Sequence, residues 1–381
     1  MKNKNITLVC PKCLKGKFQD TYVCPECGAR FSSESSVTDL RIVKVDVGKG
    51  WNASVFDEIY SKCHFPDSRD DFRMLGIPEF VEKHRLDQRD GPILEFFAKY
   101  APTSQSSLET SAVAAPVPGA FTAGTAVATT NATAKNIALQ FSPKKILDSG
   151  CGDGCFTEKV ARMLPESFFY GVDVSPFRIG RLLSKTGSGN GKMVAVAANS
   201  EHLPFEDSVF DAVLMREVLE HFYDPRKGLE EASRVLKPGG HIIVTTPSKM
   251  MFLFWRAVAF VPSLLRRVIT GSKIFDSAHR KAYDEPVSIS DLRDYFKTAG
   301  FEVVSWEKVI FLPHESYLQF FPEFMLRLMI FSAEIIKKLP FLHFTGLHHI
   351  IILRKKLIDG NGARKRRLFR YGGRECRGNS S

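Results

Sequence analysis

Hydrophobic and polar positions follow two repeating patterns between residues 144 and 306, and together they predict strands and helices in succession. Short continuous apolar runs predict buried strands at 144–148, 168–174, 193–198, 210–215 and 241–246. Helical spacing predicts helices at 156–164, 226–236 and 291–298, the last with Ser290 as its cap and Gly300 as its stop. This regular succession is typical of a doubly wound α/β fold.

Two other segments are rich in large apolar residues. Helical spacing of Phe320, Phe324, Leu328 and Phe331 predicts a helix side that faces the core or covers a substrate pocket. A lid or a membrane-surface helix is the alternative. The longest apolar stretch, 250–265, is interrupted by Arg and is shorter than the roughly 18 residues that a spanning helix needs, so no transmembrane segment is predicted.

Four of the eight cysteines form two pairs near the N-terminus. Cys10 and Cys13 make one CxxC pair, and Cys24 and Cys27 make the other. Two such turns direct four thiolates at one tetrahedral ion and leave no open coordination position, so the pattern predicts a structural zinc site. A redox dithiol and an iron–sulfur site are the less favoured alternatives.

The formal net charge of +11 is concentrated at the C-terminus. The segment 354–377 holds ten Lys or Arg against two acidic residues and so supplies +8 of that charge. A solvated tail is favoured, and binding to anionic lipid or nucleic acid is the alternative. Because the chain runs almost directly into the first Cys pair, there is no room for the apolar core of a secretion signal, and we expect a cytoplasmic protein, with membrane association left open.

A glycine-rich turn follows the first strand of the α/β pattern. Asp148 ends this strand, and Gly150 and Gly152 would let the backbone approach a ligand closely. Cys155 stands where a dinucleotide fingerprint needs Gly or Ala, so NAD binding is disfavoured. Asp173, at the end of the next strand, can accept hydrogen bonds from both ribose hydroxyls, as expected for an adenosyl ligand.

The chain resembles the class I S-adenosylmethionine-dependent methyltransferases, and within them the ubiquinone/menaquinone-type small-molecule group, also called methyltransferase type 11. The matching motifs are ILDSGCGDG at 146–154, VD at 172–173, LPFEDSVFD at 203–211, EVLEH at 217–221 and LKPGG at 236–240. The resemblance implies a Rossmann-like, seven-stranded sheet with helices on both faces, completed by strands near 301–306 and 349–353. The Cys pairs are similar to small zinc ribbons that are fused to some methyltransferases or act as their partners.

This resemblance implies a domain organisation. We expect a zinc ribbon at 1–45, a helical extension at 46–100, a flexible Ala/Thr-rich linker at 101–135, a methyltransferase domain at 136–353 with apolar insertions at 249–284 and 311–348, and a basic tail at 354–381.

The resemblance also implies S-adenosylmethionine as cofactor and assigns its site by matching positions. The glycine turn would hold the methionine part, Asp173 the ribose and Asn199 the adenine, although the family often has Asp at that last position. The expected cofactor-binding residues are Asp148, Gly150, Cys151, Gly152, Asp173, Val174, Asn199, Ser200, Met215 and Arg216.

His221 and His279 are the candidate catalytic bases, because imidazole titrates near neutrality and a hydroxyl acceptor must lose a proton. Glu217, Glu220 and His221 form an alternative divalent-metal set, as in ubiquinone-pathway O-methyltransferases. A metal-free pocket wall is favoured.

These observations predict methyl transfer to a small, apolar or lipid-like acceptor with a hydroxyl or a nucleophilic carbon. Contact with a membrane surface stays open, and nucleic acid is disfavoured because the body of the protein lacks a basic surplus. The alternatives are a ribosomal-RNA base methyltransferase that reads its substrate through the zinc ribbon, and a non-catalytic binding module.

Overall fold

A computed structural model describes residues 7–18, 23–34, 37–40, 77–101, 143–186, 192–255, 257, 285–313, 318 and 321–357. Structural statements below concern these residues. The predicted base His279, the linker after residue 101, most of the insertion at 249–284 and the tail after residue 357 lie outside the described residues.

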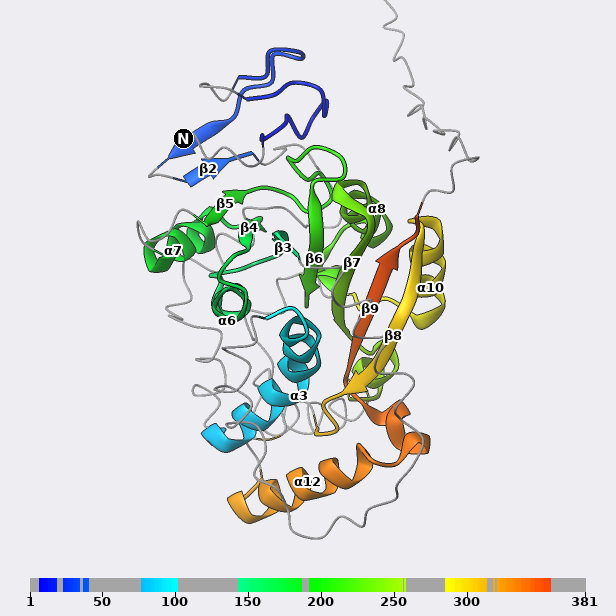
Figure 1. Cartoon of the computed structure of the whole chain (residues 1–381). Coiled ribbons are helices and arrows are strands. Elements are labelled where there is room, and N and C mark those ends of the chain that lie inside the picture. Colours follow the sequence, from blue (N-terminus) through cyan, green and yellow to red (C-terminus); the bar gives the residue numbers. More distant parts are fainter. Residues whose placement is uncertain are drawn as a thin grey trace, which may run out of the picture.

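The described strands join in one mixed sheet (Figure 1). Their bounds are β1 Ser32–Glu34, β2 Val37–Asp39, β3 Lys145–Ser149, β4 Phe168–Asp173, β5 Met193–Ala197, β6 Phe210–Arg216, β7 Leu236–Pro247, β8 Phe301–Val309 and β9 His348–Lys355. The order across the sheet is β1-β2-β5-β4-β3-β6-β7-β9-β8. Pairing is parallel from β2 to β7 in this order, whereas β1, β9 and β8 are antiparallel to their neighbours.

This topology confirms the predicted Rossmann-like α/β fold. The strands from β3 to β9 correspond to the expected seven-stranded sheet, and the two short strands β1 and β2 extend the described sheet to nine. The helices are α3 Glu79–Ala98, α6 Cys155–Met163, α7 Pro176–Thr186, α8 Pro225–Val235, α10 Ile289–Thr298 and α12 Glu323–Ile336, with short 3-10 helices η2 Leu219–His221 and η4 Pro340–Thr345.

The cap predicted for α10 is wrong by two residues. The Ser288 side chain, not that of Ser290, accepts the hydrogen bond from the Asp291 amide at 3.2 Å. Ser288 has extended dihedrals, whereas the helix begins at Ile289, so Ser288 holds the position at which a cap side chain can reach the first free amides. The predicted stop is in place, because Gly300 has the left-handed φ of +81°.

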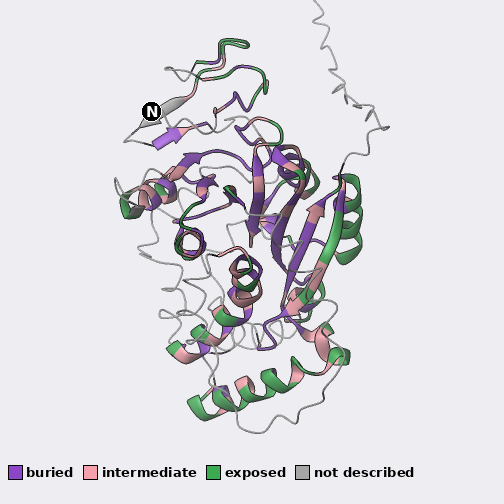
Figure 2. Ribbon diagram, in the orientation of Figure 1, coloured by how far each residue is buried: buried purple, intermediate pink, exposed green. Residues whose placement is uncertain are grey.

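Alternate residues of each central strand enter two different cores. Leu147 packs on the face covered by α8 and α10, whereas its neighbour Ile146 packs on the face covered by α3 and α6. The same alternation recurs in β9, where Ile351 and Ile352 point to opposite faces. Figure 2 shows the central strands buried between these helix layers. A strand buried on both faces gives the continuous apolar runs seen in the sequence.

The N-terminal cysteine segment shares the core of the α/β domain. Strand β2 pairs in parallel with β5, and the Leu40 amide donates to the Ala197 carbonyl at 2.7 Å. Leu40 is fully buried in the larger core together with Leu203 and Phe205. The Val9 amide also donates to the Pro204 carbonyl at 3.0 Å. The described residues of the cysteine segment therefore extend the sheet of the α/β domain.

The apolar stripe expected to face the core lies on the surface of α12. Phe324, Leu328 and Phe331 are 70, 61 and 63% exposed, and Figure 2 shows most of this helix as exposed. The helix buries Leu326 and Ala333 instead. Because large apolar residues occupy more than one side of α12, helical spacing alone did not determine which side faces inward. Within the described ranges, no helix combines the length and apolar character needed to cross a membrane.

Candidate active site

The carboxyl ends of β3 and β6 meet at the point where the strand order reverses. From β3 the chain continues outward to β4 and β5 on one side, and β6 and β7 lie on the other side. Ligands bind in such a crevice in doubly wound sheets. A pocket opens at this point. Its lining residues are Gly150, Asp173, Val174, Arg178, Asn199, Ser200, Glu217, Val218, His221 and Phe222.

The pocket brings together many of the residues predicted from the sequence. Gly150, Asp173, Val174, Asn199 and Ser200 are predicted cofactor residues that line it, and the predicted base His221 lines it as well.

Gly150 is held close to the wall opposite. Its φ is +87°, and its amide and that of Cys151 donate to the Val172 carbonyl at 2.7 and 3.0 Å. A Cβ atom placed on Gly150 would lie 2.6 Å from Cγ2 of Val218. Only glycine therefore permits both this dihedral angle and this approach between the turn and the residues that follow β6.

Asp173 is fixed by two backbone amides. Its Oδ2 atom accepts a hydrogen bond from the Gly152 amide and its Oδ1 atom accepts one from the Ser175 amide, both at 2.9 Å. Each carboxylate oxygen keeps a further lone pair. A fixed pair of acceptors at the pocket wall suits two neighbouring hydroxyls, so this site fits the ribose of an adenosyl cofactor.

Asn199 and Ser200 follow β5 and are tied to their surroundings. The Asn199 Oδ1 atom accepts from the Glu201 amide at 3.0 Å, and one lone pair of this oxygen remains for an amino group. The Ser149 hydroxyl donates to the Ser200 hydroxyl oxygen at 2.8 Å, which links this loop to the end of β3. Asn at this position therefore keeps the acceptor that the predicted adenine contact needs.

Several predicted cofactor residues are not part of the pocket lining. Asp148 is buried, accepts from the Thr157 hydroxyl at 2.5 Å, and has a pKa raised by that burial. Met215 is fully buried in the larger core. Cys151 packs in a small apolar cluster, and burial raises the pKa of its thiol well above the ordinary value. Direct contact of these side chains and of Gly152 with a cofactor stays a prediction.

Arg216 turns away from the pocket toward α3. Its Nη2 atom lies 2.6 Å from Asp90 Oδ1, and its guanidinium lies 3.5 Å from the centre of the Phe156 ring. Asp90 also pairs with Lys159 at 2.9 Å. The helix α3 is thereby joined to the end of β6 by buried charges, and the predicted position of Arg216 beside the reacting methyl also stays a prediction.

The predicted alternative metal set is divided between different partners. Glu217 Oε2 lies 2.8 Å from His348 Nδ1, and the Thr246 hydroxyl donates to Glu220 Oε2 at 3.2 Å. The motif forms a 3-10 turn instead of an α-helix, so its side chains do not share one helical face. His348 and Arg178 were missed by sequence reasoning, because neither belongs to a local motif and only folding brings them to this site.

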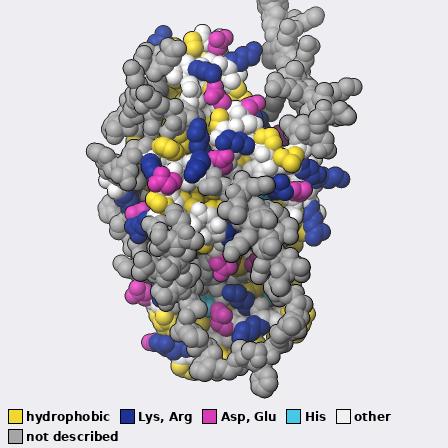
Figure 3. All heavy atoms as spheres, viewed as in Figure 1, with side chains coloured by type: hydrophobic (Ala, Val, Ile, Leu, Met, Phe, Trp, Pro, Cys, Tyr) yellow, Lys and Arg dark blue, Asp and Glu magenta, His cyan; other side chains and the backbone are white. Residues whose placement is uncertain are grey.

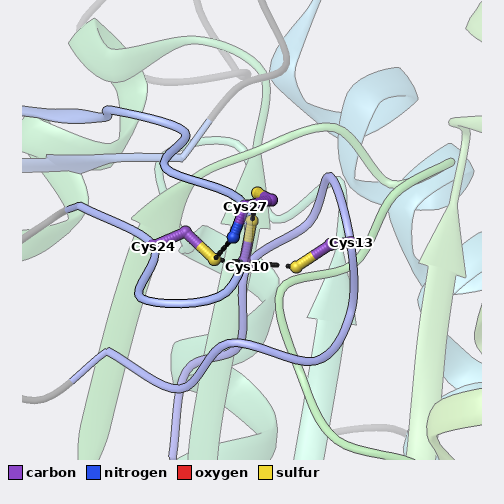
Figure 4. Close-up of side chains that lie close together, drawn as sticks. All are labelled: Cys10, Cys13, Cys24 and Cys27. Atoms are coloured by element: carbon purple, nitrogen blue, oxygen red, sulfur yellow. Dashed lines mark hydrogen bonds between the residues drawn. The ribbon is translucent and has the colours of Figure 1, made fainter.

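The four N-terminal cysteines come together as predicted (Figure 4). Their Sγ atoms all lie within 4.8 Å of one another. The Cys10–Cys27 and Cys13–Cys24 sulfur pairs are 3.7 and 3.6 Å apart. Zinc–sulfur bonds of about 2.3 Å in a tetrahedron place sulfurs about 3.8 Å apart, so the group fits a zinc ion. It is the single potential metal-binding group of His, Cys and acidic residues in the part of the chain that the structure describes.

Comparison with known proteins identifies the class to which this domain belongs. A family model described as a methyltransferase domain matches residues 147–244. The chain is 31% identical over 188 residues to a demethylmenaquinone methyltransferase of Clavibacter sepedonicus, covering 47% of this chain and 71% of the relative. It is 30% identical over 171 residues to the ubiquinone/menaquinone biosynthesis C-methyltransferase UbiE of Haemophilus ducreyi, covering 43 and 66%.

A solved S-adenosylmethionine-dependent methyltransferase from Methanosarcina mazei is similar at 20% identity and a TM-score of 0.39, covering 58% of this chain and 98% of the other. The fold and the pocket define a Rossmann-like methyltransferase. The chain belongs to the class I S-adenosylmethionine-dependent methyltransferases. Its matches to the two curated relatives take in less than half of its own length and about two thirds of theirs.

Proposed function

We propose that this protein transfers a methyl group from S-adenosylmethionine to a small, apolar or lipid-like acceptor that carries a hydroxyl or a nucleophilic carbon. The observation that carries the proposal is the Asp173 carboxylate, fixed in the pocket beside Gly150 and Asn199. The two curated relatives, both named for quinone biosynthesis, support an acceptor of this class.

S-adenosylmethionine, when bound, supplies an electrophilic methyl group on a sulfonium sulfur. The chain's part is mainly to align the partners and exclude water. Asp173 would accept the ribose hydroxyls, Asn199 the adenine amino group, and the turn at Gly150 would leave room for the methionine part. His221 lines the same pocket and is the proposed proton acceptor when the substrate is a hydroxyl.

Calorimetric titration of the Asp173→Ala variant with S-adenosylmethionine tests the cofactor site. Loss of hydrogen bonds to a charged group is worth about 1.5–3 kcal/mol, so we expect binding to weaken at least tenfold. Asp294→Ala, an exposed change on α10, is the matched control and should bind like the parent protein. Unchanged affinity in the Asp173 variant would exclude this ribose site.

We propose that Cys10, Cys13, Cys24 and Cys27 hold a structural zinc ion. The support is the spacing of their sulfurs, which leaves no open position for catalysis. Because β2 pairs with β5, the ion would support β5, the strand that leads to Asn199.

We propose that the exposed apolar side of α12 contacts an anionic bilayer. Phe324, Leu328 and Phe331 would enter the interface, and the exposed Lys337 and Lys338 at the end of the helix suit anionic headgroups. In Figure 1, α3 and α12 lie beyond the end of the sheet at which β6 stops. A lipid-like acceptor would thus approach from the side on which the pocket residues lie.

A nucleic-acid acceptor is the second candidate and is less well supported. On the face shown in Figure 3, the described basic and acidic side chains are interspersed and form no broad basic patch. A cytoplasmic location stays a prediction from the sequence.

A further inference from the structure

The pocket wall contains a carboxylate that the cofactor site does not use. Glu217 follows β6 and has a φ of +49°, in the left-handed region that non-glycine residues seldom adopt. Its amide donates to both the carbonyl and the hydroxyl oxygen of Thr245, each at 3.0 Å. These bonds to β7 fix the backbone at Glu217, which lines the pocket.

His348 reaches Glu217 from the opposite end of the chain. Strand β9 is antiparallel to β7 and places His348 beside Pro247, at the carboxyl end of the parallel strands. Its Nδ1 atom lies 2.8 Å from Glu217 Oε2, with the two side chains 17 and 22% exposed. Burial would raise the pKa of Glu217, but the charge of the neighbouring His348 outweighs it and lowers the pKa to about 2. Glu217 is therefore an anion in the pocket at neutral pH.

The second oxygen of this carboxylate, Glu217 Oε1, is buried and lacks a hydrogen-bond donor among the residues that the structure describes. A buried acceptor left unpaired is unfavourable. Val218 and Phe222 line the same part of the pocket and offer apolar contact. A donor for Oε1 would thus come from a molecule that enters the pocket with an apolar body.

We propose that Glu217 is the acceptor-recognition residue, whose Oε1 atom accepts a hydrogen bond from a hydroxyl of the methyl acceptor. His348 is the positioning residue, which lies against Oε2 and keeps the carboxylate ionised and oriented. This inference rests on the proposed function and assigns the residue that selects an acceptor with a hydroxyl. The cofactor's adenosyl part has its own acceptors in Asp173 and Asn199 on β4 and β5.

The test compares two probes that differ in a single donor. Full-length, zinc-loaded protein saturated with S-adenosylhomocysteine is titrated with 1-naphthol and with 1-methoxynaphthalene, which lacks the hydroxyl proton. A hydrogen bond to a charged acceptor predicts that 1-naphthol binds about 10- to 100-fold more tightly. In Glu217→Gln this preference should fall to about threefold or less, because the charged acceptor is lost. Glu302→Gln, an exposed change on β8, should keep the full preference.

His348 variants separate positioning from simple structural support. His348→Gln can still donate to Oε2 and should retain most of the preference for 1-naphthol, whereas His348→Leu should lose it as Glu217→Gln does. Similar results for both His348 variants would remove His348 from the proposal.

Equal affinity for the two probes in the parent protein, or binding of neither, would overturn the inference. So would a Glu217→Gln variant that keeps the preference. A tenfold loss of S-adenosylhomocysteine affinity in that variant would assign Glu217 to the cofactor and also overturn it. If the parent protein does not bind S-adenosylhomocysteine, the proposed function fails first, and the two failures are thereby distinguished.

Discussion

The buried charges between α3 and the end of β6 allow a quantitative prediction for Asp90→Asn. Asp90 and Arg216 are 5 and 13% exposed and lie 2.6 Å apart. The burial of Asp90 would raise its pKa, but Arg216, Arg89 and Lys159 together lower it, so Asp90 is ionised in the folded protein. Removing this anion leaves the buried Arg216 guanidinium without the negative charge that balances it.

Breaking a buried pair by removing one member costs about 3–5 kcal/mol. Asparagine keeps one acceptor for Arg216, so we expect the lower end, about 3 kcal/mol. For a domain of this size, such a loss lowers the melting temperature by about 6–12 °C. Urea unfolding followed by circular dichroism measures the free energy directly.

A control on the same helix separates this effect from helix propensity. Asp87→Asn makes the same chemical change at an exposed position of α3 and should alter stability by about 0.5 kcal/mol or less. Arg216→Gln should cost less than Asp90→Asn, because Asp90 retains Lys159 at 2.9 Å and Arg89 at 3.3 Å. The double variant should be more stable than the sum of the two losses implies. Equal stability of the Asp90 and Asp87 variants would refute the buried-pair argument.

Three further predictions concern other parts of the molecule. Chelation of zinc, or the Cys24→Ser substitution, should destabilise the cysteine segment and weaken S-adenosylmethionine binding in calorimetry, because β2 pairs with the strand before Asn199. Unchanged affinity with the metal removed would contradict this coupling. Burial lowers the pKa of His349 from 6.5 to about 4 in the folded protein. As the pH falls from 6.5 to 4, this imidazole is protonated in the unfolded chain before it is protonated in the folded protein. Up to about 3 kcal/mol of the free energy of unfolding is therefore lost over this range. His349→Gln should flatten this pH dependence in urea titrations, and an unchanged slope would count against it. Phe331→Ser should sediment about tenfold less with vesicles of phosphatidylcholine and phosphatidylglycerol in equal parts, whereas the exposed control Val304→Ser should sediment like the parent.

The sequence was most informative where a local pattern determines local structure. The apolar runs located the strands from β3 to β7, because a strand buried on both faces needs continuous hydrophobic residues, whereas β8 and β9 were expected from the family resemblance. The glycine turn and Asp173 were found because both belong to one short strand-turn-helix unit and the strand after it. The Cys pairs likewise carry their geometry in their spacing.

The sequence was least informative where the answer depends on packing between distant segments. The exposed side of α12 was misassigned because more than one side of this helix carries large apolar residues, so tertiary contacts decide which of them are buried. Arg216 was expected at the pocket, whereas its side chain forms an ion pair with Asp90 on α3. No local motif connects Glu217 with His348, which folding brings within 2.8 Å.

In each of these long-range contacts, a segment outside the matched family region packs at the end of the sheet that holds the site. Asp90 comes from the helix before the matched region, His348 from the last strand, and Leu40 from the cysteine segment, while the family match spans 147–244. The matched region supplies the turn, the ribose acceptor and the strand ends, which are the parts common to the class. The additional segments supply the charges and apolar contacts around them, so features that set this protein's acceptor apart are to be sought in contacts such as Glu217 with His348. An exchange of only the 147–244 region between relatives would therefore transfer cofactor binding without transferring the preference for an acceptor.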